Sequence, residues 1–171
     1  VSRGLGDVYK RQYEHLSGIR ELIEVESDFD VVATATCASV AISLIKKYRP
    51  EIVLMDINMP EKDGLTAIAE IENLDLGVRT IALTGYDDPD LIFRAMKIGA
   101  KGYILKTMAS AQLIYAIEEV AAGKIYLPST LSSRFFEYFQ NSFKEENQSI
   151  MDEENLLNYL TQREEEVLDL L

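Results

Sequence analysis

The sequence predicts a doubly wound α/β fold, in which helices cover both faces of a parallel sheet. Three observations lead to this prediction. Short apolar runs of strand length recur along the chain, amphipathic segments with helical periodicity separate them, and proline or glycine marks many of the boundaries. Because strand-like and helix-like segments alternate, each pair of strands has room for a crossover helix, which is the connection that parallel strands require.

Four apolar runs are predicted to be strands. The clearest is Ile52–Met55, which contains no polar residue, so both of its faces should be covered by helices. The other runs span residues 29–35, 80–83 and 102–105. In a parallel sheet all four would end at the same edge, where ligands of such sheets gather.

Amphipathic helices are predicted between the strands. The first ends before Pro50 and should turn an apolar stripe toward the core, made of Val40, Leu44, Ile45 and Tyr48. The second follows Gly64. The third should begin with Asp88 as its cap and Pro89 in the first helical position, and the fourth should be capped by Ser110.

Composition narrows the functional classes. The 171 residues suffice for one domain, or one domain and part of another, and the net charge of −12 disfavours nucleic-acid binding by this stretch alone. Cys37 and His15 are the only residues of their types, which excludes an internal disulfide and metal sites rich in cysteine or histidine. No run approaches the roughly 20 apolar residues of a membrane span, and no secretory signal is present, so we expect a cytoplasmic protein.

Polar residues follow the predicted strands where a site should form. Asp56, Thr84 and Lys106 each stand at a strand end, and Tyr103 lies within the last strand. A carboxylate, a hydroxyl and an ammonium at one edge suit the formation of an aspartyl phosphate. Each residue also has an ordinary structural explanation: a loop acid, a cap, a surface charge and a packed aromatic ring. Four such coincidences at one edge favour a single site.

Three stretches, VLMDINMPEKDG, IALTGYDD and AMKIGAKGYILK, resemble the receiver domain of bacterial two-component response regulators of the NarL/FixJ type. The resemblance runs from about Gly18 to about Tyr126 and implies a flavodoxin-like sheet with strand order 2-1-3-4-5. It implies that Asp56 is the phosphoacceptor and that the switch and phosphate contacts come from Thr84, Tyr103 and Lys106.

The resemblance also implies a Mg²⁺ site. Asp56 and the backbone carbonyl of Asn58 would be two of its ligands, and two adjacent acids at the end of a first strand would supply the others. Counting back places those acids near Lys10 and Arg11, where the charge has the opposite sign. We therefore expect Mg²⁺ in the intact parent protein and weak or no binding by this fragment.

The front of the chain is interpreted as foreign. The stretch DVYKRQ, residues 7–12, resembles the translation of a sequencing-library transposon end, so the first twelve residues are excluded from the fold argument. The native first strand is then missing, and segments 29–35 and 52–56 lack the neighbour between them, although Val8 and Tyr9 could fill part of the gap. The alternative is a degenerate receiver that has lost its metal site.

The end of the chain resembles a second domain. The stretch LTQREEEVLDLL, residues 160–171, is similar to the first helix of a LuxR-type helix-turn-helix domain. The predicted organisation is a leader over 1–12, a receiver over 13–126, a linker helix and acidic linker over 127–155, and an incomplete helix-turn-helix domain over 156–171. The linker helix should present one apolar face, made of Leu131, Phe135, Tyr138 and Phe139. The chain is thus predicted to be a fragment truncated at both ends.

The resemblance implies a transcriptional response regulator rather than an enzyme, with only its own phosphorylation and dephosphorylation as chemistry. A sensor histidine kinase would phosphorylate Asp56, and the face formed by helix 89–98, strand 102–106 and helix 110–122 would switch, dimerise or release the DNA-binding domain. DNA would be bound only through the missing C-terminal domain, and no membrane is involved. One alternative is a phosphorylation-independent pseudo-receiver that acts as an interaction module. Another is a haloacid-dehalogenase-like phosphatase, which is disfavoured because Asn58 stands where that class has a second acid.

Overall fold

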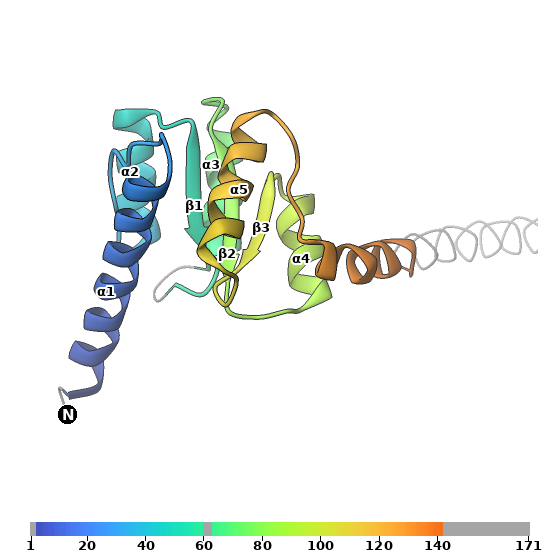
Figure 1. The fold of residues 1–171 in the computed structure, drawn as a ribbon, viewed down its shortest axis with the longest axis horizontal. Coiled ribbons are helices and arrows are strands. Elements are labelled where there is room, and N and C mark those ends of the chain that lie inside the picture. Colours follow the sequence, from blue (N-terminus) through green and yellow to red (C-terminus); the bar gives the residue numbers. More distant parts are fainter. Residues whose placement is uncertain (1–2, 60–62, 142–171) are drawn as a thin grey trace, which may run out of the picture.

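The computed structural model of the chain describes residues 3–59 and 63–141. Three parallel strands lie at its centre in the order β1-β2-β3: β1 (Ile52–Asp56), β2 (Arg79–Thr84) and β3 (Gly102–Leu105). This confirms the predicted α/β class and three of the four predicted strands (Figure 1). Because consecutive strands are parallel neighbours, a helix connects each pair, namely α3 (Gly64–Asn73) and α4 (Pro89–Lys97).

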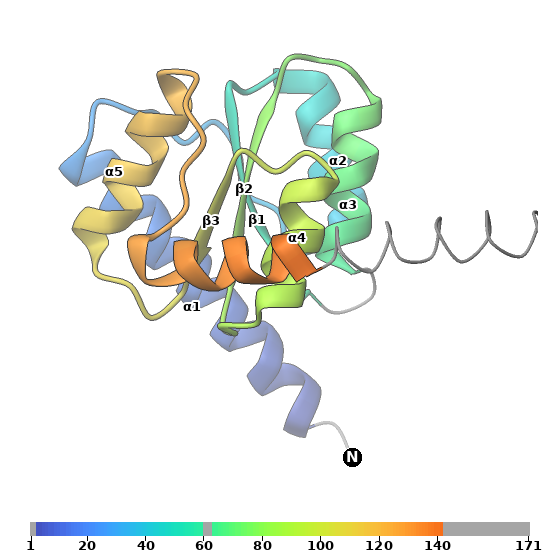
Figure 2. The ribbon, with the colours of Figure 1, turned by 90° about the vertical axis from the view of Figure 1, so that its right-hand side faces the viewer.

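Helices cover both faces of the sheet, as the term doubly wound requires (Figure 2). On one face α3 and α4 are joined by α2 (Ala38–Tyr48), and Ile42, Ile68 and Ile92 form part of that core. On the other face α5 (Ser110–Ala121) packs with α1 (Arg3–Glu26) around Ile81, Ile104 and other residues of the strands. No described helix is long and apolar enough to cross a membrane.

Residues 29–35 do not form the predicted strand. They belong to no ladder, yet their exposure alternates with the period of two that is typical of a strand, with Phe29 and Val31 turned inward. The physical reason is that a ladder needs a neighbouring strand, and none lies between this segment and β1 in the described part of the chain. Val8 and Tyr9 lie within α1, so the expectation that they replace the first strand is wrong.

Two smaller predictions about helices are also wrong. The inner face of α2 is rotated from the predicted stripe, because Val40 and Tyr48 are 46% and 47% exposed while Ile42 is buried. Helix α5 begins at Ser110 itself, so the capping position belongs to Ala109 and carries no side-chain cap. The predicted start of α4 is confirmed, since the Asp88 carboxylate accepts a hydrogen bond from the Asp90 amide and Pro89 is the first helical residue.

Residues 129–141 form a further helix that lies across α4 (Figure 2). It is anchored by Leu131, which is 1% exposed and belongs to the core beneath α4. The ring of Phe93 on α4 packs against aromatic rings on this helix at centroid distances of 5.3 to 6.2 Å, and these belong to Phe135, Tyr138 and Phe139. The apolar face predicted for this segment is therefore confirmed.

Two polar contacts tie the same helix to the loop that follows β2 and to the first turn of α4. The Arg134 guanidinium forms an ion pair with Asp87 at 2.6 Å, and the Tyr138 hydroxyl donates to the carboxylate of Asp90 at 2.7 Å. The loop connects Thr84 to α4, so this helix contacts the segment adjacent to the predicted site. The predictions for residues 142–171, including the helix-turn-helix domain, lie outside the described residues.

Candidate functional site

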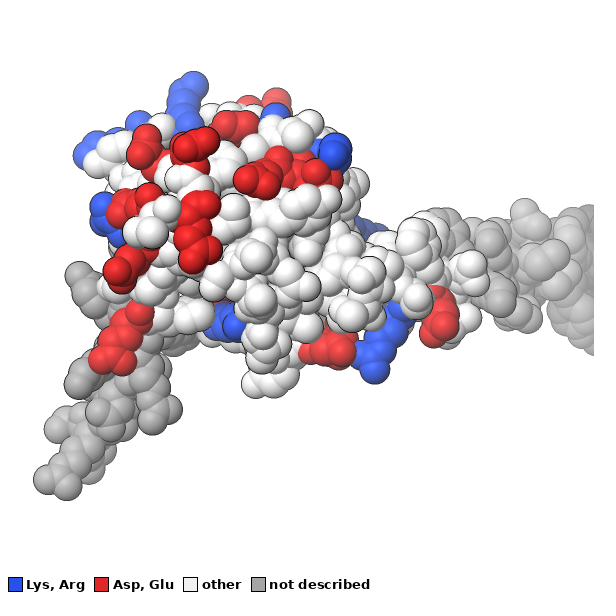
Figure 3. All heavy atoms as spheres, in the orientation of Figure 1, with Lys and Arg blue, Asp and Glu red and all other residues white. Residues whose placement is uncertain are grey.

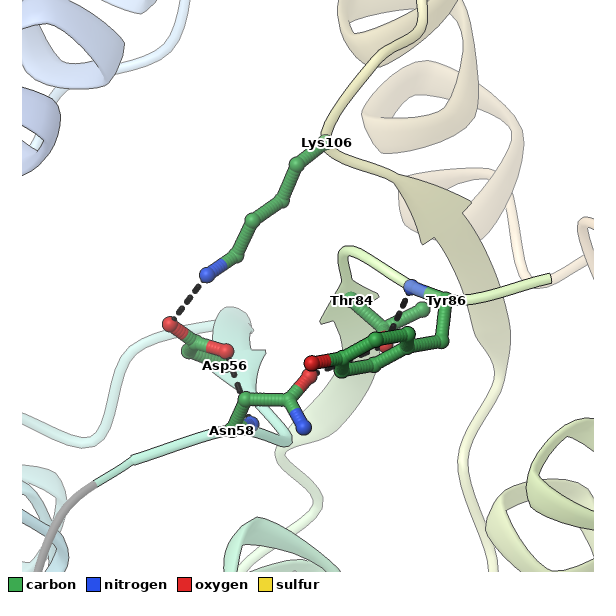
Figure 4. A network of polar contacts seen from close by, with 5 residues as sticks. All are labelled: Asp56, Asn58, Thr84, Tyr86 and Lys106. Carbon is green, nitrogen blue, oxygen red and sulfur yellow. Dashed lines mark hydrogen bonds and ion pairs between the residues drawn. The ribbon is translucent and has the colours of Figure 1, made fainter. Parts of the chain in front are cut away.

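Three of the sequence-predicted residues, Asp56, Thr84 and Lys106, lie at the carboxyl edge of the sheet (Figure 4). Asp56 is the last residue of β1, Thr84 is the last residue of β2, and Lys106 follows β3 directly. The Lys106 ammonium donates to Oδ2 of Asp56 at 2.6 Å, which is the length of a strong charge-assisted hydrogen bond. Both side chains are about one quarter exposed, at 24% for Asp56 and 26% for Lys106, so solvent reaches the ion pair.

The second oxygen of Asp56 is held by the backbone. Its Oδ1 accepts a hydrogen bond from the amide of Asn58 at 2.9 Å. This bond makes an Asx-turn, in which the aspartate side chain stabilises the turn that follows it. The carboxylate is thereby fixed between a backbone amide on one side and the Lys106 ammonium on the other. Such a pair of donors orients the carboxylate and can stabilise negative charge beside it.

Thr84 does not contact Asp56 directly. Its buried hydroxyl donates to the side-chain oxygen of Asn58 at 3.1 Å and accepts from the amide of Tyr86 at 3.2 Å. Asn58 therefore links Asp56 to Thr84. Sequence reasoning missed this role of its side chain because it considered only the backbone carbonyl of Asn58. A polar residue two positions after the strand end was the available signal.

Tyr103 lies fully buried beneath the loop that follows β2. Its hydroxyl donates to the backbone carbonyl of Tyr86 at 3.2 Å. Burial raises the pKa of Tyr103 to about 12, the nearby Asp88 and Asp87 add to the increase, and the Thr84 hydroxyl partly offsets it. The ring is consequently neutral at physiological pH and acts as a donor to the loop. The participation of Tyr86 was not predicted, because only the loop geometry reveals it.

Gly64 shapes the segment that presents Asp56. A Cβ at this position would lie 2.5 Å from the Cα of Ile57, and closer still to the carbonyl oxygen of Asp56, so no other residue fits without movement of the backbone. The Gly64 amide donates to the Ile57 carbonyl at 3.1 Å, and Asp63 caps α3 through the amide of Leu65. The close approach of helix to strand explains the Asp-Gly pair. The resemblance to receiver domains also implies that Pro60 shapes this loop, but Pro60 lies outside the described residues.

The donor set does not fit the Mg²⁺ ion that the resemblance implies. Among the described residues, no three side chains of aspartate, glutamate, histidine or cysteine gather where they could hold a metal. Asp56 supplies one carboxylate, and its Oδ2 already accepts from Lys106. Mg²⁺ requires near-octahedral oxygen ligands, so one paired carboxylate and one carbonyl are a weak site.

Comparison with known proteins agrees with this geometry. A family model described as the response regulator receiver domain matches residues 12–118. The chain is 36% identical over 157 residues to the transcriptional regulatory protein DesR of Bacillus subtilis, which covers 91% of this chain and 68% of DesR. It is 31% identical over 161 residues to the transcriptional regulatory protein DegU of Brevibacillus brevis, covering 90% and 68% of the two chains.

Solved structures show the same fold. A LuxR-family two-component response regulator from an Aurantimonas species superposes with a TM-score of 0.68 at 31% identity, covering 71% of this chain and 87% of the other. A LuxR-family DNA-binding response regulator from Staphylococcus aureus gives a TM-score of 0.61 at 28% identity, covering 64% and 91%. Proteins of this kind are regulators rather than classical enzymes. The chain belongs to the response regulator receiver family, and its relatives are LuxR-family transcriptional regulators.

Proposed function

We propose that this receiver accepts a phosphoryl group on the carboxylate of Asp56 from the phosphohistidine of a sensor kinase. One carboxylate oxygen attacks phosphorus, a P–O bond forms and the P–N bond to the imidazole breaks. The imidazole keeps the electron pair and takes a proton from solvent. The observation that supports this most strongly is the 2.6 Å contact of Lys106 with a partly exposed Asp56, which places a cation where the phosphoryl oxygens would lie.

The new charge would then act on Thr84. A phosphoryl group adds roughly −1.5 to −2 charge units and three acceptor oxygens, and it competes with Asn58 for the threonine hydroxyl. Because the amide of Tyr86 donates to that same hydroxyl, movement of Thr84 carries the loop with it. The hydrogen bond from Tyr103 to the Tyr86 carbonyl extends the response to the ring beneath the loop.

The output would be transcriptional control through a DNA-binding domain of the LuxR type, as for the relatives named above. The loop after Thr84 leads into α4, so the face formed by α4, β3 and α5 is proposed to exchange between two states and to support a homodimer. We place the whole process in the cytoplasm. The phosphorylation-independent interaction module is the second candidate. It is favoured because, among the residues that the structure describes, no cluster of three possible metal ligands lies at the site.

Incubation with acetyl phosphate or phosphoramidate, with and without Mg²⁺, tests the proposal. Intact-mass measurement and phosphate-affinity gels should show slow labelling of the wild-type chain and none of Asp56→Asn, which preserves the shape of the side chain. Equal labelling of Asp56→Asn would refute the assignment of the phosphoacceptor. Complete absence of labelling at saturating donor would favour the interaction module.

A further inference from the structure

The helix over residues 129–141 binds α4 with one face. The side chains of that face recur at positions i, i+3, i+4, i+7 and i+8, which lie on one side of a helix. Laying such a face on a partner surface is a recurring way in which proteins recognise helices. The surface of α4 therefore has the form of a helix-binding site, which is occupied by a helix of the same chain. The five side chains of this face are Leu131, Arg134, Phe135, Tyr138 and Phe139.

Burial of this face decreases along the helix. Leu131 is fully buried, Phe135 is partly buried against the same core, and Phe139 is exposed. The core thus anchors the start of the helix, whereas its end rests on the partly exposed ring of Phe93 on α4. Lifting the end exposes less apolar area than lifting the start, so the end can separate first without unfolding the domain.

The polar contacts of the helix are weak enough to be reversible. In the ion pair of Arg134 with Asp87 the side chains are 52% and 44% exposed, and exposed ion pairs contribute little stability because water and salt screen them. Figure 3 shows acidic and basic side chains next to each other below this helix, where solvent reaches both. The Tyr138 hydroxyl bonds to the half-exposed carboxylate of Asp90. These contacts can therefore decide the position of the helix end without locking it.

The loop that follows β2 is tied to the carboxyl edge of the sheet and to the helix at consecutive residues. The Tyr86 amide donates to the hydroxyl of Thr84, and the Tyr86 carbonyl accepts from the hydroxyl of Tyr103, each at 3.2 Å. The next residue, Asp87, accepts from Arg134 at 2.6 Å. Because neighbouring Cα atoms are about 3.8 Å apart, a displacement of Tyr86 moves Asp87 with it. The loop thus joins Thr84 to the helix through one peptide unit.

We propose that this loop couples the docking of the helix to the state of Asp56, so that a phosphoryl group on Asp56 releases the end of the helix from α4. The inference rests on the function proposed above. Thr84, turning toward a phosphoryl oxygen, draws the loop with it, and Asp87 then leaves Arg134. The buried start of the helix keeps its place in the core. The helix is thus a hinged regulatory element of the receiver.

The coupling acts in both directions, because linkage between two sites is reciprocal. While the helix is docked, Arg134 holds Asp87 and keeps the loop in the position where Thr84 bonds to Asn58. The docked helix therefore opposes the movement that a phosphoryl group requires and slows phosphorylation of Asp56. Release of the helix should accordingly make Asp56 easier to phosphorylate.

Amide hydrogen exchange of the full chain tests the coupling without any phosphoryl donor. Thr84→Val removes the hydroxyl that accepts from Tyr86 and should speed exchange of amides 136–141 at least about twofold relative to those of α3. Thr80→Val is the matched control, because Thr80 is buried in the same strand but its hydroxyl makes no hydrogen bond within the described residues. Equal exchange of amides 136–141 in the two variants would overturn the proposal.

Phosphoryl labelling tests the reverse direction. Arg134→Gln should speed labelling of Asp56 by acetyl phosphate about twofold to fivefold. Arg20→Gln should leave the rate unchanged, since it breaks an ion pair of similar exposure on α1, at 51% and 40%. Equal rates for these two variants, or a labelled chain whose amides 136–141 stay as protected as in Asp56→Asn, would overturn the coupling. Absence of labelling would refute the proposed function instead, and the exchange of Thr84→Val would still decide whether the loop and the helix are coupled.

Discussion

Replacing Gly64 by alanine should both destabilise the protein and disturb Asp56. The added Cβ would stand 2.5 Å from the Cα of Ile57, whereas ordinary contacts begin at 3.4 Å, so the two must separate by about 0.9 Å. The three nearest atoms all belong to the backbone of Asp56 and Ile57, so no rotation of a side chain can make room. Forcing an extra methyl group into a packed site costs about 1–3 kcal/mol, and here the backbone that moves carries Asp56, the proposed phosphoacceptor.

Urea denaturation measures the first effect and phosphoryl labelling measures the second. With a slope of about 1–3 kcal/mol per molar urea, the midpoint of Gly64→Ala should fall by roughly 1 M. Gly85→Ala is the matched control, because Gly85 also adjoins the site but a Cβ there meets nothing within 4 Å and its φ is not positive. If Gly64→Ala and Gly85→Ala had the same urea midpoint and the same labelling rate, the inference that a Cβ at position 64 displaces the backbone of Asp56 would be wrong.

Three further predictions concern the helix across α4, the buried tyrosine and the ion pair. Leu131→Ala should lower the free energy of unfolding by about 2–5 kcal/mol, because the side chain is 1% exposed. Phe136→Ala, at a side chain that is 58% exposed, should change it little. Similar denaturant midpoints for the two variants would contradict this prediction. The pKa of Tyr103 is about 12 in the folded state and 10.0 in the unfolded state. The stability that its neutral hydroxyl adds to the folded state is therefore complete below pH 10 and is lost as the pH rises toward 12. Tyr103→Phe should therefore lose less free energy of unfolding between pH 10 and pH 12 than the wild type, by up to about 3 kcal/mol. If the variant and the wild type had the same pH profile of stability, Tyr103 would not be a buried neutral hydroxyl. Lys106→Ala should alter stability by no more than about 1 kcal/mol but slow labelling of Asp56 at least tenfold, about the effect of losing one preorganised donor; a severely destabilised variant would assign the lysine a structural role.

The parts of the site that could be predicted are those that depend on strand direction. Asp56, Thr84 and Lys106 follow apolar runs, and parallel strands must end at one edge, so their convergence required only the correct fold class. The start of α4 was equally predictable, because the cap and the proline of an Asp-Pro pair act within one turn.

What could not be predicted depends on neighbours or on loop geometry. Segment 29–35 has the composition and exposure pattern of a strand but lacks a partner, and a ladder is a property of two segments rather than one. The face of α2 was misjudged because Val40 and Ile42 are equally apolar, so only packing decides which is buried. The bonds of Asn58 and Tyr86 to Thr84 arise from the path of two loops, which residue types alone do not define.

The helix over residues 129–141 covers part of the α4 surface that we propose for a homodimer. This helix packs against the ring of Phe93, and its Arg134 forms an ion pair with Asp87 in the loop after Thr84. A homodimer that used the same surface would first have to displace the helix. The free energy of that displacement is subtracted from the free energy of dimerisation, and a tenfold loss of dimer affinity follows from every 1.4 kcal/mol. A phosphoryl group that moves the loop would loosen the ion pair to Arg134, so the helix would act as an intramolecular competitor whose strength the phosphorylation state adjusts.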